Sequence, residues 1–331
     1  MNFIDNPVFV CGHRKSGTTL LISLLDNSEN LLTYPDDSGF FYLYHPGFTG
    51  PGVPRVEKLA RLANAVIREN LGYTVNDPCI PLDAREHLKS CQEECATIIE
   101  RSISEDLSLR GSLIELMHAF HSSFFPKKTN ISRWVEKTTS TEIYALELID
   151  CFPEAKFIHL LRDPRDNWAS LKSHWFSRYQ EYNDELARLL QSLLERGRLG
   201  MQMANANKNS IGDNYHIVKF EDLVEKPDQT LSAITDFLEI DLTSTMFQPS
   251  VFGWPWAGNN KDGIEFSAID PHNVGRWEER IPIHEAQLIE FYFESLMKDH
   301  GYIPRFDQRD CQRAATEHYK WFNFATTYSS K

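Results

Sequence analysis

One short stretch near the start of the chain has the residue types and spacing of a phosphate-binding loop. It reads Gly-His-Arg-Lys-Ser-Gly-Thr-Thr over residues 12–19, after an apolar run and before a leucine-rich helical pattern. Glycines at such a junction permit a tight turn whose backbone N–H groups point inward, and the following helix adds a partial positive charge. The spacing matches the GxxxxGK[ST] nucleotide-binding pattern in all positions but one.

The one departure concerns the lysine of that pattern. Where an NTPase has the lysine that reaches its β and γ phosphates, this chain has Thr18, and the cation has moved to Lys15 inside the loop. Thr19 keeps the hydroxyl position. Such a loop suits a nucleotide whose single 5′-phosphate carries a transferable group. A Mg²⁺-dependent kinase or NTPase is the first alternative, with Asp163 at the end of an apolar run as its metal ligand.

A second candidate phosphate site lies in the middle of the chain. Arg162 follows a largely apolar run over residues 156–161, and ligands in open α/β sheets bind at the carboxyl ends of strands. Ser170 lies about two turns into the helix that Pro164 is expected to begin. We therefore expect the guanidinium and the hydroxyl to hold one further phosphate group.

These candidate residues need a sheet to position them, and the chain predicts one. Short apolar runs alternate with stretches of helical periodicity, which indicates a parallel sheet covered on both faces. We expect one α/β domain over residues 1–331, a three-layer α/β/α sandwich of P-loop nucleotide-kinase type with about five parallel strands. The predicted strands cover residues 8–11, 31–34, 134–136, 156–161 and 216–220. The predicted helices cover residues 18–25, 56–71, 85–106, 112–124, 141–151, 164–174, 184–206, 227–238 and 284–300.

Two further segments are too long to be simple connections. Residues from about 50 to 130 are mostly helical in pattern and predict a helical insertion. Residues from about 243 to 283 are rich in Gly, Pro, Asn and Trp, which is typical of a functional loop. We expect these segments to build an acceptor pocket, together with aromatic residues that gather at 40–48 after the second strand, at 175–179 and at 254–256.

Composition excludes several classes of protein. The 331 residues include 34 Lys and Arg against 47 Asp and Glu, a net charge of −13, which argues against a nucleic-acid surface. We expect no membrane span and a cytoplasmic location, because no apolar window is long enough and the first residues do not resemble a signal peptide. The six cysteines lack CxxC pairs and predict reduced thiols. His87, Cys91 and Cys95 recur on one helical face without a fourth ligand, so we expect no metal.

The motifs together resemble the sulfotransferases that use 3′-phosphoadenosine 5′-phosphosulfate (PAPS). In that family a segment like GHRKSGTTLL holds the 5′-phosphosulfate, and one like LLRDPRDNWASL holds the 3′-phosphate. Weaker likenesses follow in the same order at residues 135–138, 218–224 and 274–282. The resemblance implies transfer from PAPS to a hydroxyl, or less readily an amine, of a small-molecule, carbohydrate or lipid acceptor, with 3′-phosphoadenosine 5′-phosphate (PAP) as product. A noncatalytic module that binds PAP or PAPS is the second alternative.

The resemblance also implies which residues contact the nucleotide. Lys15 would contact the bridging and sulfuryl oxygens, and Arg162 with Ser170 would hold the 3′-phosphate. The loop near Arg276 would close over the nucleotide. The implied nucleotide-binding residues are Arg14, Lys15, Ser16, Gly17, Thr18, Thr19, Arg162, Ser170, Val274, Gly275, Arg276 and Trp277.

The general base is predicted from the same likeness. Relatives that sulfate saccharides or tyrosine have a Glu some twenty residues after the loop cation, whereas this chain has Asp36 and Asp37. We predict Asp37 as the base, with Asp36 next and a histidine, His118 or His121, as a further alternative. Lys137 resembles a lysine near the reaction centre of such enzymes, where it steers the acceptor or stabilises the leaving oxygen.

Overall fold

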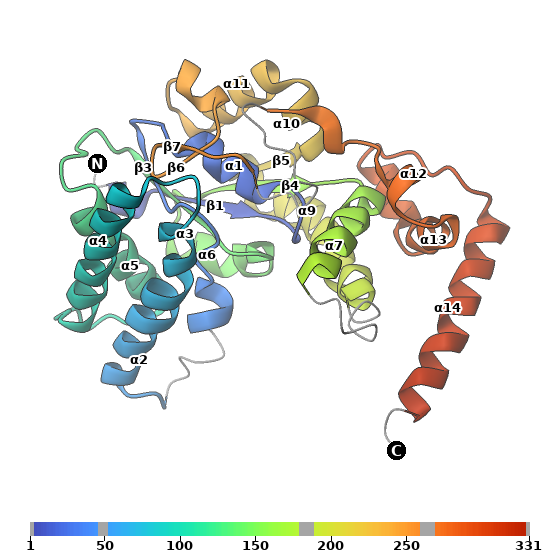
Figure 1. Ribbon diagram of the computed structural model, residues 1–331, viewed down its shortest axis with the longest axis horizontal. Helices are drawn as coiled ribbons and strands as arrows, with labels where there is room; N and C mark the ends of the chain where they lie inside the picture. Colours follow the sequence, from blue (N-terminus) through green and yellow to red (C-terminus); the bar gives the residue numbers. More distant parts are fainter. Residues whose placement is uncertain (1–2, 46–51, 179–188, 259–268, 329–331) are drawn as a thin grey trace.

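A parallel five-stranded sheet forms the centre of the protein, and helices cover both of its faces (Figure 1). The computed structural model describes residues 3–45, 52–178, 189–258 and 269–328. The strand order is β2-β3-β1-β4-β5, and every neighbouring pair is parallel. The strands are β1 (Pro7–Cys11), β2 (Leu31–Thr33), β3 (Arg133–Lys137), β4 (Lys156–Leu161) and β5 (Tyr215–Lys219). The predicted α/β fold with a parallel sheet of about five strands is confirmed.

The strand order determines what lies beside the loop that follows β1. Val10 pairs with Lys137 of β3 on one side and with Ile158 of β4 on the other. The carboxyl ends of parallel strands meet at one edge of the sheet. The loop after β1 is therefore flanked by Lys137 on one side and by Arg162 on the other.

Successive strand residues pack on opposite faces, as a sheet with two covered faces requires. The covering helices are α1 (Thr18–Leu25), α5 (Leu109–Phe124), α6 (Ala145–Cys151), α9 (Arg198–Ile211), α10 (Phe220–Glu225) and α11 (Pro227–Leu238). Val8 and Val10 belong to a buried cluster with α1, α10 and α11. Phe9 and Cys11 belong to a second cluster with α5 and α6. These two clusters explain why the strands are almost continuously apolar.

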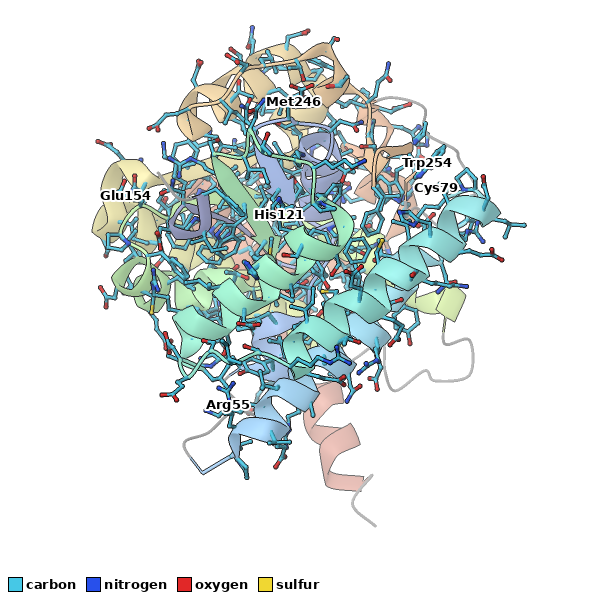
Figure 2. All side chains as sticks on the ribbon, turned by 90° about the vertical axis from the view of Figure 1, so that its left-hand side faces the viewer. Arg55, Cys79, His121, Glu154, Met246 and Trp254 are labelled. Carbon is cyan, nitrogen blue, oxygen red and sulfur yellow. The ribbon has the colours of Figure 1, made fainter. Side chains whose placement is uncertain are left out.

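Helices also fill the segment between β2 and β3. They are α2 (Arg55–Arg61), a π-helical stretch η3 (Leu62–Leu71), α3 (Gly72–Val75), α4 (Leu82–Glu100) and α5. Figure 2 looks onto α4 and α5, with His121 on the latter. The helix predicted over residues 85–106 begins earlier and ends earlier, and the one predicted over 56–71 changes to π-helix midway. Buried residues such as Val66 and Phe120 join these helices to the core of one sheet face.

The rest of the chain packs beyond β4. It comprises α7 (Pro164–Arg178), α12 (Trp277–Arg280), α13 (Ile283–Asp299) and α14 (Gln308–Tyr328). A hairpin of β6 (Ser250–Val251) and β7 (Trp254–Pro255) lies instead beside α1 and the end of β2. The sequence did not predict α14, which packs on α13 and extends away from the sheet (Figure 1). Part of the helix predicted over 184–206 lies outside the described residues. None of the described helices is long and apolar enough to cross a bilayer.

Candidate active site

The predicted phosphate loop connects β1 to α1 through an unusual backbone. Gly12 has φ 135°, Gly17 has φ 96° and Lys15 has φ 64°, so three residues adopt positive φ. A Cβ atom at Gly12 would lie 2.7 Å from the carbonyl oxygen of Leu160, and one at Gly17 would clash with the ring of Phe220. The two glycines are therefore required both by the backbone and by their neighbours. The left-handed Lys15 carries a strain of about 1 kcal/mol.

Buried polar groups hold this loop from the sheet side. The N–H of Gly12 donates to Oε2 of Glu142 at 3.0 Å, and burial raises the pKa of Glu142 to about 7. Arg162 donates through Nη1 to the carbonyl oxygen of Lys15 at 2.9 Å. These bonds join the loop to the segments that follow β3 and β4.

Arg162 connects three segments that the sequence assigned to nucleotide binding. Besides its bond to the loop, it donates through Nη2 to the carbonyl oxygen of Asn273 at 2.8 Å. Its guanidinium lies 4.3 Å from the ring centroid of Phe220. Burial lowers its pKa from the ordinary value, although an arginine stays charged. Ser170, the predicted partner, lies partly exposed in α7.

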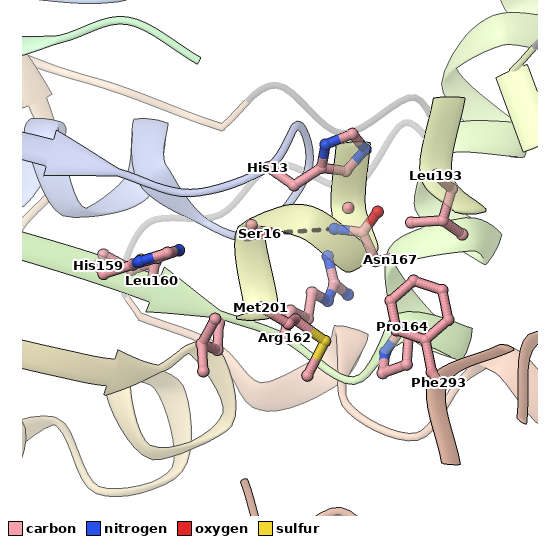
Figure 3. Close-up of a pocket in the computed structure, with 13 residues that line it drawn as sticks. His13, Ser16, His159, Leu160, Arg162, Pro164, Asn167, Leu193, Met201 and Phe293 are labelled. Atoms are coloured by element: carbon pink, nitrogen blue, oxygen red, sulfur yellow. Dashed lines mark hydrogen bonds between the residues drawn. The ribbon is translucent and has the colours of Figure 1, made fainter. Parts of the chain in front are cut away.

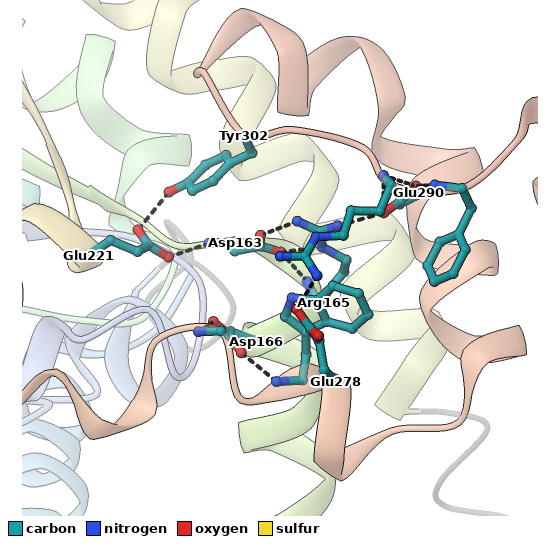
Figure 4. A network of polar contacts seen from close by, with 11 residues as sticks. Asp163, Arg165, Asp166, Glu221, Glu278, Glu290 and Tyr302 are labelled. Atoms are coloured by element: carbon teal, nitrogen blue, oxygen red, sulfur yellow. Dashed lines mark hydrogen bonds and ion pairs between the residues drawn. The ribbon is translucent and has the colours of Figure 1, made fainter.

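The late loop is fixed to the first turn of α7 by a carboxylate. Asp166 accepts hydrogen bonds from the N–H groups of Gly275, at 2.6 Å, and Trp277, at 2.8 Å. The guanidinium of Arg165 stacks 4.4 Å from the Trp277 ring centroid. Figure 4 shows these contacts within a larger polar network. The predicted residues Val274, Gly275, Arg276 and Trp277 thus follow Asn273 beside Arg162.

Asp163 does not resemble a metal ligand. Its Oδ1 accepts hydrogen bonds from the N–H and Nε of Arg165, and its Oδ2 lies 2.6 Å from Nη2 of that arginine (Figure 4). The guanidinium of Arg165 neutralises the charge of this carboxylate and occupies both of its oxygens, so Asp163 is poorly suited to bind a magnesium ion. Among the described residues no group of three or more His, Cys, Asp or Glu side chains is placed to hold a metal.

On the other side of the phosphate loop, a lysine connects the loop with two carboxylates. Nζ of Lys137 lies 3.2 Å from Oγ1 of Thr19, 3.5 Å from Oδ1 of Asp36 and 3.5 Å from Oδ2 of Asp37. Burial alone would lower the pKa of this lysine, but the carboxylates of Asp37 and Asp36 raise it. Lys137 is therefore held in its charged form at the end of the loop.

The two carboxylates have different surroundings. Asp37 accepts hydrogen bonds from Gly39 N–H, Tyr42 hydroxyl and both the N–H and hydroxyl of Thr139, at 2.8 to 3.2 Å. Burial tends to raise the pKa of Asp37, but Lys137 and these bonds outweigh it and lower the pKa. The side chain of Asp36 is 44% exposed against 19% for Asp37.

A cavity of about 200 Å³ opens beside Asp36. It lies between α1, the end of β2, the α3 region and the β6–β7 hairpin, so both segments predicted to build an acceptor pocket contribute to it. Figure 2 shows Cys79 and Trp254, which neighbour two of these segments, at the same edge of the molecule. The lining residues are Thr19, Ser23, Pro35, Asp36, Tyr73, Thr74, Asp77, Ser250, Val251 and Trp256.

The alternative histidine bases lie elsewhere. His121 shares a hydrogen bond of 3.0 Å with the carbonyl of Lys128, and its ring packs on Phe3, which precedes β1. It thus lies near the amino edge of the sheet, opposite the phosphate loop. His118 is exposed one turn earlier on α5. The geometry therefore favours a carboxylate at the site.

Comparison with known proteins identifies the family of this chain. The sequence profile described as "Sulfotransferase family" matches residues 7–244, which is most of the chain and includes both phosphate motifs. The chain belongs to the sulfotransferase family. The membership predicted from the motifs is confirmed, and with it the assignment as a sulfotransferase enzyme.

Solved sulfotransferases share the fold. The sulfotransferase domain from the curacin biosynthetic pathway is 16% identical, with a TM-score of 0.56 over 91% of this chain and 99% of that one. The sulfotransferase domain of the Synechococcus PCC 7002 olefin synthase is 18% identical, with a TM-score of 0.50 over 90% of this chain and 96% of that one. At this identity the likeness concerns the arrangement of the sheet and its helices.

Sequence reasoning missed several residues that shape this sulfotransferase site. Glu142 and Asp166 bind backbone N–H groups of the two predicted loops, and Asn167 contacts the phosphate loop. Glu136 is fully buried in β3, where burial raises its pKa to about 7. A carboxylate inside an apolar run was the available signal for Glu136, but the partners of the others are distant in sequence.

The close contact at Gly17 gives a first prediction. Gly17→Ala should lower the free energy of unfolding by about 1 to 3 kcal/mol more than Gly212→Ala, measured by denaturant unfolding. Both glycines have positive φ, but a Cβ atom at Gly212 meets no atom within 4 Å. Equal losses in the two variants would show that the Phe220 contact does not constrain the loop.

Proposed function

We propose that this sulfotransferase moves a sulfuryl group from PAPS to a hydroxyl group held in the cavity beside Asp36. The observation that supports this most strongly is the convergence on one loop. Lys137 and the cavity lie at Thr19, and Arg162 joins the same loop to the late loop at Asn273. A donor held along the loop would therefore present its 5′-end toward the acceptor cavity.

The residues present suit a 3′,5′-phosphorylated nucleotide. The loop provides a turn with two positive-φ glycines at the N-terminus of α1, where backbone N–H groups can face a phosphate. Lys15 would contact the sulfuryl and bridging oxygens, and Ser16, Thr18 and Thr19 would cradle the 5′-phosphate with Gly17 and Arg14. Ser170 and the Arg162 region would hold the 3′-phosphate, and residues 274–277 would cover the nucleotide.

The reaction needs a base, and the surroundings favour Asp36 over the predicted Asp37. The acceptor oxygen attacks sulfur, the bond from sulfur to the 5′-phosphate oxygen breaks, and the acceptor proton passes to a carboxylate of the enzyme. Asp36 lines the cavity, whereas Asp37 is occupied by four hydrogen bonds and has a lowered pKa. We therefore propose Asp36 as the base and Asp37 as the anchor of the segment. Lys137 stabilises charge near Thr19.

The acceptor cavity favours neutral or positively charged acceptors. Its lining has two carboxylates, Asp36 and Asp77, and no Lys or Arg among the described residues. Oδ1 of Asp77 accepts a hydrogen bond from the N–H of Cys79 at 2.9 Å, which fixes its orientation. Tyr73 and Trp256 add aromatic surface that suits a sugar, an apolar alcohol or an ammonium group. Because Asp36 is already paired with Lys137, an anionic acceptor would meet repulsion mainly from Asp77.

The assignment of the base predicts different results for two neighbouring carboxylates. Asp36→Asn should lower the transfer rate about 10² to 10⁴-fold without changing PAP affinity. Asp37→Asn should instead lower the free energy of unfolding at neutral pH. Because folding lowers the pKa of Asp37, its contribution is present above its unfolded pKa near 4 and is lost as pH falls through its folded pKa.

Radiolabelled sulfuryl transfer and pH-dependent unfolding measure these two effects. The stability difference between wild type and Asp37→Asn should shrink as the pH falls below about 4. Normal turnover in Asp36→Asn, together with lost turnover in a stable Asp37→Asn, would show that Asp37 is the general base.

The 3′-phosphate contact is tested best at Ser170, because Arg162 also supports the loop. Ser170→Ala should weaken PAP binding about tenfold, the usual effect of losing a hydrogen bond to a charged group, and leave AMP binding nearly unchanged. Ser173→Ala, a partly exposed serine in the same helix, is the matched control. Calorimetric titration measures both affinities, and equal losses of affinity for PAP and AMP would contradict a role of Ser170 at the 3′-phosphate.

The charge of the cavity predicts a preference among acceptors of one length. An amino alcohol should exceed the matching hydroxy acid in kcat/KM, with the neutral diol between them. Asp77→Asn should reduce the preference for the amino alcohol by up to about fivefold, as expected for a partly exposed ion pair. Asp83→Asn, which changes an exposed carboxylate in α4 outside the cavity lining, should not. A preference for hydroxy acids would refute this account of the acceptor.

A further inference from the structure

Asn167 contacts the phosphate loop from the helix that follows β4. It is buried in α7, and its Nδ2 donates to the carbonyl oxygen of Arg14 at 2.9 Å and to Oγ of Ser16 at 3.0 Å. Figure 3 shows this side chain reaching the loop, with the bond to Ser16 drawn. Both amide hydrogens of Asn167 are therefore committed to two neighbouring parts of the loop.

The bond to the carbonyl of Arg14 fixes the direction of an N–H group. A peptide unit is planar and trans, so its C=O and N–H point in opposite directions. With the carbonyl of Arg14 turned toward α7, the N–H of Lys15 must point to the other side of the loop. A flip of this peptide would instead present a carbonyl dipole to an anion. Lys15 also has the left-handed backbone, which persists only where its surroundings hold it.

Unpaired polar atoms gather beneath the same loop. Within the part of the chain that the structure describes, Oδ1 of Asn167, Nε of Arg162 and both ring nitrogens of His13 are buried without a hydrogen-bond partner. Their side chains line one small cavity of about 20 Å³ (Figure 3). Burial, with Arg14 and Arg196 nearby, lowers the pKa of His13 to about 4, so its ring is neutral at pH 7 and offers one donor and one acceptor.

The cavity matches a single water molecule. A site of this volume holds about one water, which needs two to four polar partners. Such a water can accept from Nε of Arg162 and donate to Oδ1 of Asn167 and to the unprotonated nitrogen of His13. Three of these four atoms would then be satisfied without any change of side chain, and only the protonated nitrogen of His13 would keep no partner.

We propose that Asn167 is a positioning residue for sulfuryl transfer, which fixes the peptide between Arg14 and Lys15 so that its N–H faces the 5′-phosphate, and that one ordered water completes this support. The inference rests on the proposed function, because it assumes that the loop binds the 5′-phosphate. It assigns Asn167 no contact with either substrate. Its effect should therefore appear equally for every nucleotide that carries a 5′-phosphate.

The chain offers a matched control for this test. Asn207 in α9 is equally buried, and its Nδ2 also donates to a backbone carbonyl, that of Glu142 at 2.9 Å, and to a hydroxyl, that of Tyr215 at 3.3 Å. Neither acceptor belongs to the phosphate loop. Asn167→Leu and Asn207→Leu thus remove similar bonds from similar depths, and only the first removes bonds to the loop itself, since Asn207 reaches it only through Glu142.

The experiment measures PAP and AMP affinity by calorimetry, thermal stability, and kcat and KM for transfer. Both variants should lose similar stability. Asn167→Leu alone should weaken PAP and AMP about tenfold each, with a lower kcat and an unchanged KM for the acceptor. If Asn167→Leu does not fold, Asn167→Asp takes its place, since its carboxylate repels the Arg14 carbonyl and should produce the same losses.

Four results would overturn the proposal or one of its parts. Unchanged nucleotide affinity in Asn167→Leu or Asn167→Asp would exclude the positioning role. Equal affinity losses in the Asn207→Leu control would show that a general loss of stability explains the effect. A wild-type protein that binds neither PAP nor AMP would refute the proposed function itself, and this inference with it. A high-resolution crystal structure should show a water within hydrogen-bond distance of Oδ1 of Asn167, and a dry cavity would refute that part.

Discussion

The candidate site of this sulfotransferase is built around a tightly turned loop at the carboxyl end of its central strand. Gly12, Lys15 and Gly17 adopt positive φ, and the loop can do so only because neighbouring segments hold it. With β1 between β3 and β4, the ends of those strands supply Lys137 on one side and Arg162 on the other. The strand order thereby separates the side on which we propose that the acceptor binds from the side on which we propose that the 3′-phosphate binds.

The buried charges near the loop act as geometric constraints more than as sources of stability. Removing an ion from water is expensive, and a buried ion pair contributes little net free energy compared with apolar packing. Arg165 nevertheless bridges Asp163 and Glu290, at 2.6 Å each, and Asp166 binds two N–H groups of the late loop (Figure 4). Because each partner is specific, these groups allow one arrangement of α7, α13 and the late loop.

The sequence was informative where a signal is local. The apolar runs predicted the five strands, and the glycine spacing predicted the loop, because both depend on neighbouring residues. Roles that depend on distant partners were not predictable, as with Asn167, whose acceptors lie about 150 residues away. Asp37 was predicted as the base from the family likeness and stays a prediction, and the surrounding donors, Thr139 among them, are the reason that we propose it as an anchor instead. The two-residue strands of the β6–β7 hairpin are too short to carry a pattern.

The central claim is that this loop and its neighbours bind a nucleotide with one 5′-phosphate and a 3′-phosphate. Calorimetric titration of the purified protein with PAP, AMP and ATP, each with and without Mg²⁺, tests it most directly. The account predicts tight, metal-independent binding of PAP, weaker binding of AMP, and no advantage for ATP with Mg²⁺. Preference for ATP with Mg²⁺ would contradict the account and would indicate an enzyme that transfers phosphate.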